Sequence, residues 1–275
     1  MPRAERFAVP GLLVAMVVSA VATLIWSHDL TFWQDELNWL VFGPGYDPEL
    51  LITPHNGHLL TTTRLIYEAL PPVTGDDYLP FRLILTTSIL AIAALVFVLV
   101  RRRVGGLLAL GCACVLLFFG TAPDQVVSPV GIGFALSLAF ALGALVAFDA
   151  GRKNMDALGC VLLVLATLSF TIGFLISFAV AVWFVTTREN RRRAWAPLIP
   201  VVLWGVWWIW ALKFDQGVFE ADNIIGLPAY VLAASRSRSR SRWERSSPST
   251  RAGRTWTCSA VAFWSSPRCR SRSAS

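Results

Sequence analysis

The chain has 275 residues, of which 55% are hydrophobic and only 15% are charged. A soluble domain of this size normally carries about 25% charged residues. The apolar residues also fall into long blocks rather than alternating with polar ones. These features exclude an ordinary soluble globular protein and indicate an integral membrane protein.

The net charge of +7 comes from the C-terminal tail of the chain. Residues 1–234 hold 14 basic and 16 acidic residues, whereas residues 235–275 hold ten arginines and one glutamate. The basic character is therefore no evidence that the body of the chain binds nucleic acid, and we expect no nucleic-acid partner. The five cysteines have no metal-ligand spacing and predict no disulfide framework.

The apolar blocks predict an all-α fold, a polytopic transmembrane bundle of about seven helices. About 20 apolar residues cross a bilayer as a helix. Such runs lie at residues 7–26, 81–100, 104–121, 129–148, 157–186 and 195–212. The first run has a cleaved signal peptide as its alternative, but it is long for that role and lacks a clear cleavage site. The run 157–186 is too long for one crossing, so we expect two helices that meet near Thr171-Ile172-Gly173.

The distribution of charge predicts the orientation of these helices. With the N-terminus in the cytoplasm, eleven basic residues of the body lie inside and only Arg64, Arg82 and Lys213 lie outside. Twelve of the sixteen acidic residues then lie outside. This pattern satisfies the positive-inside rule in every loop and predicts a multi-pass plasma-membrane protein.

The composition changes abruptly near residue 234. Residues 228–234 resemble the start of an eighth helix, and residues 235–242 are a strict alternation of serine and arginine. A shift of reading frame in GC-rich codons would turn this alternation into alanine alternating with valine or leucine. We therefore expect an out-of-frame tail on a module of residues 1–234 that belongs to a longer protein. The alternative is a disordered arginine-serine tail that binds nucleic acid or anionic lipid.

Most of the plausible chemistry lies in residues 27–81, the first extracytoplasmic loop. This loop contains all three histidines and eight carboxylates. Asp35 and Glu36 are adjacent and follow soon after the first helix. Adjacent residues of a helix point about 100° apart, so the two acids can hardly share one ligand. One of them is a candidate base or ligand of a divalent cation, and the other a candidate for orienting a partner group. Both could also be solvated loop acids.

A second polar segment runs from Pro54 to Glu68. Its apolar residues recur at helical spacing from Leu59 to Leu70, which predicts a short amphipathic helix on the membrane surface. Arg64 then offers a donor to a lipid phosphate, and His55 or His58 could assist a proton transfer. The His55-x-x-His58 pair is more typical of interfacial hydrogen bonding than of a zinc site, because no further ligands follow.

These segments resemble the GT-C type membrane glycosyltransferases, which include protein mannosyltransferase-like and aminoarabinose transferase-like enzymes. Gln34-Asp35-Glu36 is similar to the acidic motif of their first extracytoplasmic loop. Pro54-His55-Asn56-Gly57-His58-Leu59 is similar to a segment of uncharacterised actinobacterial members. The family usually has more helices and often a C-terminal extracytoplasmic domain.

The resemblance implies an inverting transfer of a sugar from a polyprenyl phosphate to an acceptor outside the membrane. It suggests Asp35 as the catalytic base or metal-associated acid. Asp124, in the next external turn, is a candidate second carboxylate for the substrate, with a helix cap as its alternative. The rival functions are a transporter or lipid-flipping module and an inactive truncated product. Transporters usually carry charges inside their spans, and these spans contain almost none.

Overall fold

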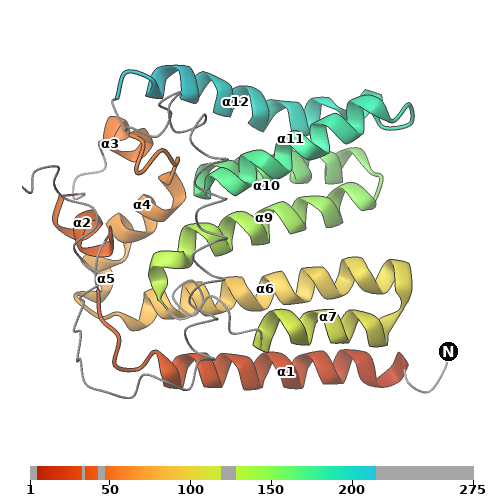
Figure 1. Cartoon of the computed structure of the whole chain (residues 1–275), viewed down its shortest axis with the longest axis horizontal. Helices are drawn as coiled ribbons and strands as arrows, with labels where there is room; N and C mark the ends of the chain where they lie inside the picture. The colour runs from red at the N-terminus through yellow and green to blue at the C-terminus, as the bar shows by residue number, and fades with distance from the viewer. Residues whose placement is uncertain (1–4, 33–34, 43–46, 119–127, 215–275) are drawn as a thin grey trace, which may run out of the picture. The chain divides into compact units, whose positions relative to one another are not determined.

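The computed structural model describes residues 5–32, 35–42, 47–118 and 128–214, and every regular element in these ranges is a helix (Figure 1). The predicted all-α class is therefore confirmed for this part of the chain, which lies within one structural unit, Met1–Val218. The predicted eighth helix at 228–234, the tail 235–275 and Asp124 lie outside the described residues.

The long helices of the described residues run side by side in alternating directions and form a bundle (Figure 1). They are α1 (Glu5–Trp26), α6 (Leu79–Val104), α7 (Gly106–Phe118), α9 (Ile132–Asp149), α10 (Lys153–Ser169), α11 (Thr171–Thr186) and α12 (Trp195–Ala211). Short 3-10 turns, η1 (Pro129–Gly131) and η2 (Arg191–Arg193), precede α9 and α12. The helices follow the apolar blocks of the sequence closely.

Three of the described helices are long and apolar enough to cross a membrane, judged by length and composition. These spans are Glu5–Trp26, Leu79–Val104 and Pro129–Asp149. The prediction of about seven spans is too high by this measure. The apolar helices α7, α11 and α12 have 13, 16 and 17 residues, and α10 carries two charged residues in its first turn. A helix of 17 residues is only about 25 Å long, whereas the hydrocarbon core is about 30 Å thick.

The arginine-rich turns lie together at one end of the bundle, on the right of Figure 1. Arg102 Nη1 donates a hydrogen bond of 2.7 Å to Asp149 Oδ2, which joins the last turns of α6 and α9. Arg193 Nε donates at 2.9 Å to Asp156 Oδ2 in the first turn of α10. The basic segments that the positive-inside rule assigns to one side of the membrane are therefore neighbours in space.

The predicted break within the apolar run 157–186 is confirmed. Helix α10 ends at Ser169, Phe170 is fully extended (φ −167°, ψ 156°), and α11 begins at Thr171. The two helices then cross closely, because a Cβ added to Gly173 would lie 2.2 Å from the carbonyl of Ala166. Only glycine allows this approach.

The opposite end of the bundle carries four short helices, α2 (Asp35–Phe42), α3 (Pro48–Ile52), α4 (Thr61–Ala69) and α5 (Pro71–Thr74) (Figure 1). Helix α4 is the predicted amphipathic helix. Its buried residues Thr63 and Tyr67 lie on the face that the sequence marked as apolar. Helix α4 packs against α2, α9 and α10, and its buried face covers the end of the bundle.

Candidate functional site

A tight turn holds the two histidines of the loop. The backbone N–H of His55 donates to the carbonyl of His58 at 3.0 Å, and the N–H of His58 donates to the carbonyl of His55 at 2.9 Å. Asn56 (φ 49°) and Gly57 (φ 75°) between them both have left-handed backbones. Two such residues form a type I′ turn, which Asn-Gly adopts more easily than other pairs. The sequence Asn56-Gly57 therefore fixes the two histidines at neighbouring positions.

The first residue of α2 lies beside this turn. Asp35 Oδ2 lies 3.3 Å from His55 Nε2, within the range of an ion pair but without the angles of a hydrogen bond. Trp39, one turn further along α2, packs edge-on against the His55 ring with a centroid distance of 5.6 Å. The carboxylate of Asp35 is 47% exposed, whereas the His55 side chain is 16% exposed. The structure thus brings together two of the predicted site residues, one accessible to solvent and one nearly buried.

His58 contacts the break between α10 and α11. Its Nδ1 lies 2.8 Å from the hydroxyl of Thr171, and its ring packs on that of Phe170 at 4.4 Å. Burial, and then the nearby His55, lower the pKa of His58 below its ordinary value. The lowered pKa favours the neutral form of His58, and its contacts with Thr171 and Phe170 fasten the loop to the bundle.

A cavity of about 230 Å³ opens where α2, the histidine turn, α4 and the start of α9 meet. Its polar lining comes from Asp35, His55, Asn56, His58 and Thr63. Its remaining walls are apolar or aromatic and come from Trp39, Leu60, Val130, Gly133, Phe134 and Phe170. A concave site with apolar walls and a few converging polar groups is typical of small-molecule binding. We name it the Asp35 cavity.

Glu36 points away from the Asp35 cavity, as the 100° rotation between neighbouring helix residues requires. Its carboxyl group is fully buried and accepts hydrogen bonds from the hydroxyls of Tyr67 at 2.5 Å and Tyr78 at 2.9 Å. This contact joins α2 to α4 and to the residue before α6. The predicted catalytic role of Glu36 stays a prediction, but the position of its side chain is that of a structural link.

The described residues do not supply a complete set of ligands for the divalent cation considered in the sequence analysis. Among the described residues no three His, Cys, Asp or Glu side chains lie close enough together to hold a metal ion. Asp35 and His55 supply two such groups, and Glu36 is occupied by the tyrosines. The described residues alone therefore do not complete a metal site.

Arg64 lies on the side of α4 that faces α3. Its Nη1 donates to the carbonyls of Leu50 and, at 2.6 Å, Thr53. Burial lowers the pKa of Arg64 from its ordinary value. The guanidinium therefore caps the last turn of α3, and its predicted contact with a lipid phosphate stays a prediction.

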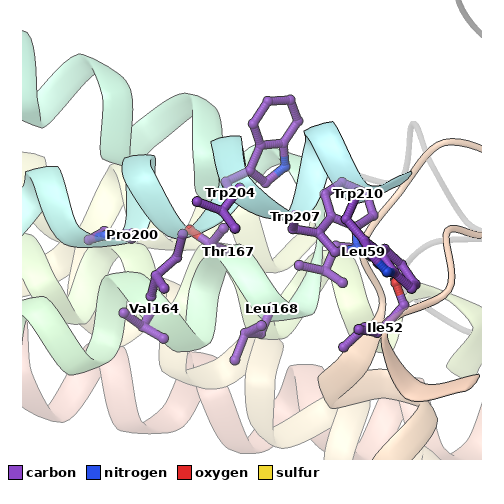
Figure 2. Close-up of a pocket in the computed structure, with 11 residues that line it drawn as sticks. Ile52, Leu59, Val164, Thr167, Leu168, Pro200, Trp204, Trp207 and Trp210 are labelled. Atoms are coloured by element: carbon purple, nitrogen blue, oxygen red, sulfur yellow. Dashed lines mark hydrogen bonds between the residues drawn. The ribbon is translucent and has the colours of Figure 1, made fainter. Parts of the chain in front are cut away.

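A second, apolar hollow of about 410 Å³ lies between α10 and α12 (Figure 2). Its lining includes Val164, Leu168 and Pro200 within the bundle and Ile52 and Leu59 at the loop end, as Figure 2 shows. Three tryptophans of α12 complete it, namely Trp204, Trp207 and Trp210. Trp207 Nε1 donates at 2.7 Å to the carbonyl of Ile52, which fastens α3 to this helix. We name this hollow the tryptophan groove.

Two residues near these hollows had no role in the sequence-based prediction of the site. Thr63 belongs to the apolar face of α4, and nothing in the sequence marks it as a cavity residue. Lys213 follows α12, with its Nζ 4.3 Å from the centre of the Trp210 ring and 2.9 Å from Glu49 Oε1. The sequence does not show that Lys213 lies near a hollow, because only the structure shows that Trp210 lines the tryptophan groove. The Asn-Gly signal of the histidine turn, by contrast, could have been read from the sequence.

Comparison with known proteins adds no relative. The sequence matches no model of a protein family and no curated protein, and the fold matches no solved structure. The candidate site therefore depends on its own geometry and chemistry.

Proposed function

We propose that this protein is a membrane glycosyltransferase that moves a sugar from a polyprenyl phosphate to an acceptor at the extracytoplasmic face. The observation that carries this proposal is the pairing of Asp35 with His55 on the wall of a cavity. The cavity also adjoins an apolar groove, since Leu59 lines the tryptophan groove and its neighbour Leu60 lines the Asp35 cavity. A substrate with a polar head and a long hydrocarbon chain matches these two adjoining surfaces.

In this proposal each of the two hollows binds a different part of the donor. The tryptophan groove is almost wholly apolar and suits the hydrocarbon chain. The sugar enters the Asp35 cavity, and the phosphate lies between the two. Lys213, beside Trp210, is a cation at the loop end of the groove and a candidate partner for the phosphate.

Asp35 acts as the general base in the reaction. Its carboxylate takes the proton from the acceptor hydroxyl as the hydroxyl oxygen forms a bond to the anomeric carbon of the sugar. The bond between that carbon and the phosphate oxygen breaks, and the polyprenyl phosphate leaves with the electron pair. Attack opposite the leaving group inverts the anomeric centre. His55 positions the carboxylate of Asp35. Lys213 balances the charge of the departing phosphate.

The bundle is proposed to lie in the plasma membrane with all seven helices embedded. The shorter α7, α10, α11 and α12 lie alongside the three long spans (Figure 1). Neighbouring protein can satisfy the backbone where such helices end within the membrane. The arginine-rich end is cytoplasmic in this proposal, together with the N-terminus, because basic loops are retained inside. The Asp35 cavity then opens on the extracytoplasmic side.

Labelling in intact cells tests this orientation. A cysteine introduced at exposed Asp29, in a variant without the five native cysteines, is expected to react with a membrane-impermeant maleimide. A cysteine at Arg188 is expected to react only after the membrane is opened. If only the cysteine at position 188 is labelled in intact cells, the orientation is the opposite of the proposed one.

Turnover tests the chemistry. We expect Asp35→Asn to lower the transfer of sugar from a polyprenyl-phosphate donor by about 10²- to 10⁴-fold, the usual contribution of a general base. Asp29→Asn is the matched control, because the Asp29 side chain is 98% exposed and lies outside the cavity. Undiminished turnover in Asp35→Asn would remove Asp35 from this role. Binding of the donor without any turnover by the wild type would favour a lipid-carrying function instead.

A further inference from the structure

The Asp35 cavity contains polar atoms that lack partners within the described residues. Five buried side-chain nitrogen or oxygen atoms have no hydrogen-bond partner in this part of the chain. Three of the five belong to residues that line this one cavity, namely Trp39 Nε1, His55 Nε2 and Thr63 Oγ1. Of these, His55 Nε2 also lies 3.3 Å from Asp35 Oδ2, a contact that lacks the angles of a hydrogen bond. Buried polar atoms are rarely left without a partner in folded proteins. Their concentration at one cavity therefore indicates that a bound molecule completes their hydrogen bonds.

Thr63 is the most deeply buried of the three residues, with 1% of its surface exposed. Its hydroxyl lies against Gly133 at the start of α9, where a Cβ would approach Oγ1 to 2.5 Å. Gly133 lines the same cavity and so leaves room for this hydroxyl at the cavity wall. Packing holds the hydroxyl in this position, and it has no hydrogen-bond partner within the described residues.

The types of polar group restrict the ligand. An indole N–H only donates, a hydroxyl both donates and accepts, and a neutral imidazole nitrogen does one or the other. Asp35, on the same wall, accepts when ionised and repels an anion. The ligand must therefore offer both donors and acceptors at several points and must carry no negative charge in the cavity. A sugar ring meets these conditions, whereas a phosphate group does not.

The size and walls of the cavity agree with this class of ligand. A cavity of about 150 Å³ is sufficient for one benzene molecule. The Asp35 cavity, with about 230 Å³, has room for one six-membered ring with hydroxyl groups. Phe134 and Phe170 supply apolar surface for the faces of the ring.

We propose that the Asp35 cavity binds a single sugar ring and that Thr63, His55 and Trp39 are the residues that recognise its hydroxyl groups. The inference rests on the proposed function, because it names the part of the donor that this cavity receives. Thr63 is a specificity-determining residue in this arrangement, since its hydroxyl faces one position of the ring. A sugar without a hydroxyl at that position leaves Thr63 buried and unpaired and is bound less tightly.

Binding of free sugars by the purified full chain, in detergent, tests this inference without requiring catalysis. Saturation-transfer NMR with the methyl glycosides of a hexose and a pentose supplies the signal, and cyclohexanol is the ring without multiple hydroxyls. We expect the wild type to bind at least one glycoside and to discriminate against cyclohexanol. Thr63→Val is expected to lower the affinity about tenfold, the effect of losing one well-made hydrogen bond. Thr63→Ser, which keeps the hydroxyl, is expected to restore binding.

Thr86→Val is the matched control. Thr86 on α6 also has a buried hydroxyl without a partner in the described residues, but it does not line the cavity. Its replacement is expected to leave binding unchanged. Unchanged binding in Thr63→Val, or no binding of any glycoside by the wild type, would overturn the inference and indicate that only water occupies the cavity. Sugar binding that depends on Thr63, without any transfer from a lipid donor, would support the inference and contradict the proposed function.

Discussion

The hydroxyl of Tyr67 donates a hydrogen bond of 2.5 Å to Oε1 of Glu36, and both side chains are buried where the loop meets the bundle. Tyr78 donates to Oε2 of the same carboxyl group at 2.9 Å. One carboxyl group thus fastens α2 to α4 and to the start of α6. Since Asp35 is the neighbour of Glu36, this link also fixes the direction in which Asp35 faces the cavity.

Removal of the Tyr67 hydroxyl is expected to loosen this link. Tyr67→Phe leaves a buried carboxyl oxygen with fewer donors, and we expect a loss of about 1–3 kcal/mol in the free energy of unfolding. Thermal melting of the protein in detergent measures the change. Thr86→Val, which removes a buried hydroxyl with no partner in the described residues, is the control and is expected to be neutral or stabilising. Equal melting temperatures for Tyr67→Phe and the wild type would contradict the structural role of this contact.

The same tyrosine predicts a loss of stability in alkali. Burial, and then the neighbouring Glu36, raise the pKa of Tyr67 above its ordinary value of 10.0. Above pH 10 the unfolded chain therefore releases the phenolic proton while the folded chain retains it. This contribution to stability is complete below pH 10 and is lost as the pH rises further. Melting temperatures between pH 8 and 11 are expected to fall more steeply for the wild type than for Tyr67→Phe. Parallel curves would show that Tyr67 is not responsible.

Hydropathy and charge predicted much of the bundle from the sequence. The helix boundaries near Trp26, Phe81 and Trp195 and the break at Thr171 agree with the predicted ones within a few residues. By length and composition, three of the described helices qualify as spans rather than about seven, because apolar composition does not report helix length. Residues 104–121 read as one apolar run, whereas α7 as described ends at Phe118 after 13 residues.

The candidate site was predictable only in part. The 100° rotation between Asp35 and Glu36 correctly separates their environments. The Asn56-Gly57 pair contains enough information to place His55 beside His58. The contacts of His58 with Thr171 and of Thr63 with Gly133 join segments about 70 to 113 residues apart. Such contacts depend on how α4 docks on the bundle, and no local sequence pattern determines that.

Acid is expected to weaken the contact between the loop and the bundle. Because the pKa of His58 is lowered by burial and by His55, the folded chain resists its protonation below pH 6.5 while the unfolded chain accepts the proton. The contribution of His58 is complete above pH 6.5 and is lost as the pH falls through the lowered pKa. His58→Gln is expected to flatten the decrease in melting temperature between pH 7 and 5, whereas His28→Gln at an exposed site should not. A flattened profile in His28→Gln alone would contradict this assignment.

Two glycines of the bundle are expected to respond oppositely to the same substitution. A Cβ at Gly173 would meet the backbone of Ala166 at 2.2 Å, so Gly173→Ala must force α10 and α11 apart. We expect a cost of about 1–3 kcal/mol or more. Gly205 on α12 has no atom within 4 Å of such a Cβ. Gly205→Ala is therefore expected to stabilise the helix by up to about 1 kcal/mol. Melting temperatures that shift in the same direction for both variants would contradict the close crossing of α10 and α11.

The arginine-rich end offers a comparison between a buried and an exposed carboxylate. Asp156 is 5% exposed and accepts hydrogen bonds from Arg193 Nε and Nη2. Asp149 is 35% exposed and forms an ion pair with Arg102.

Asp156→Asn leaves the charge of Arg193 without its partner in a mostly buried position, and we expect a loss of about 3–5 kcal/mol in the free energy of unfolding. Asp149→Asn breaks a solvated pair, for which we expect a loss of less than about 1 kcal/mol. Denaturation in mixed micelles at low and at high salt measures both changes. Salt should diminish the effect of Asp149→Asn more than that of Asp156→Asn, because solvent ions screen the exposed pair. Similar losses in the two variants would show that Asp156 is no more important to the bundle than a surface acid.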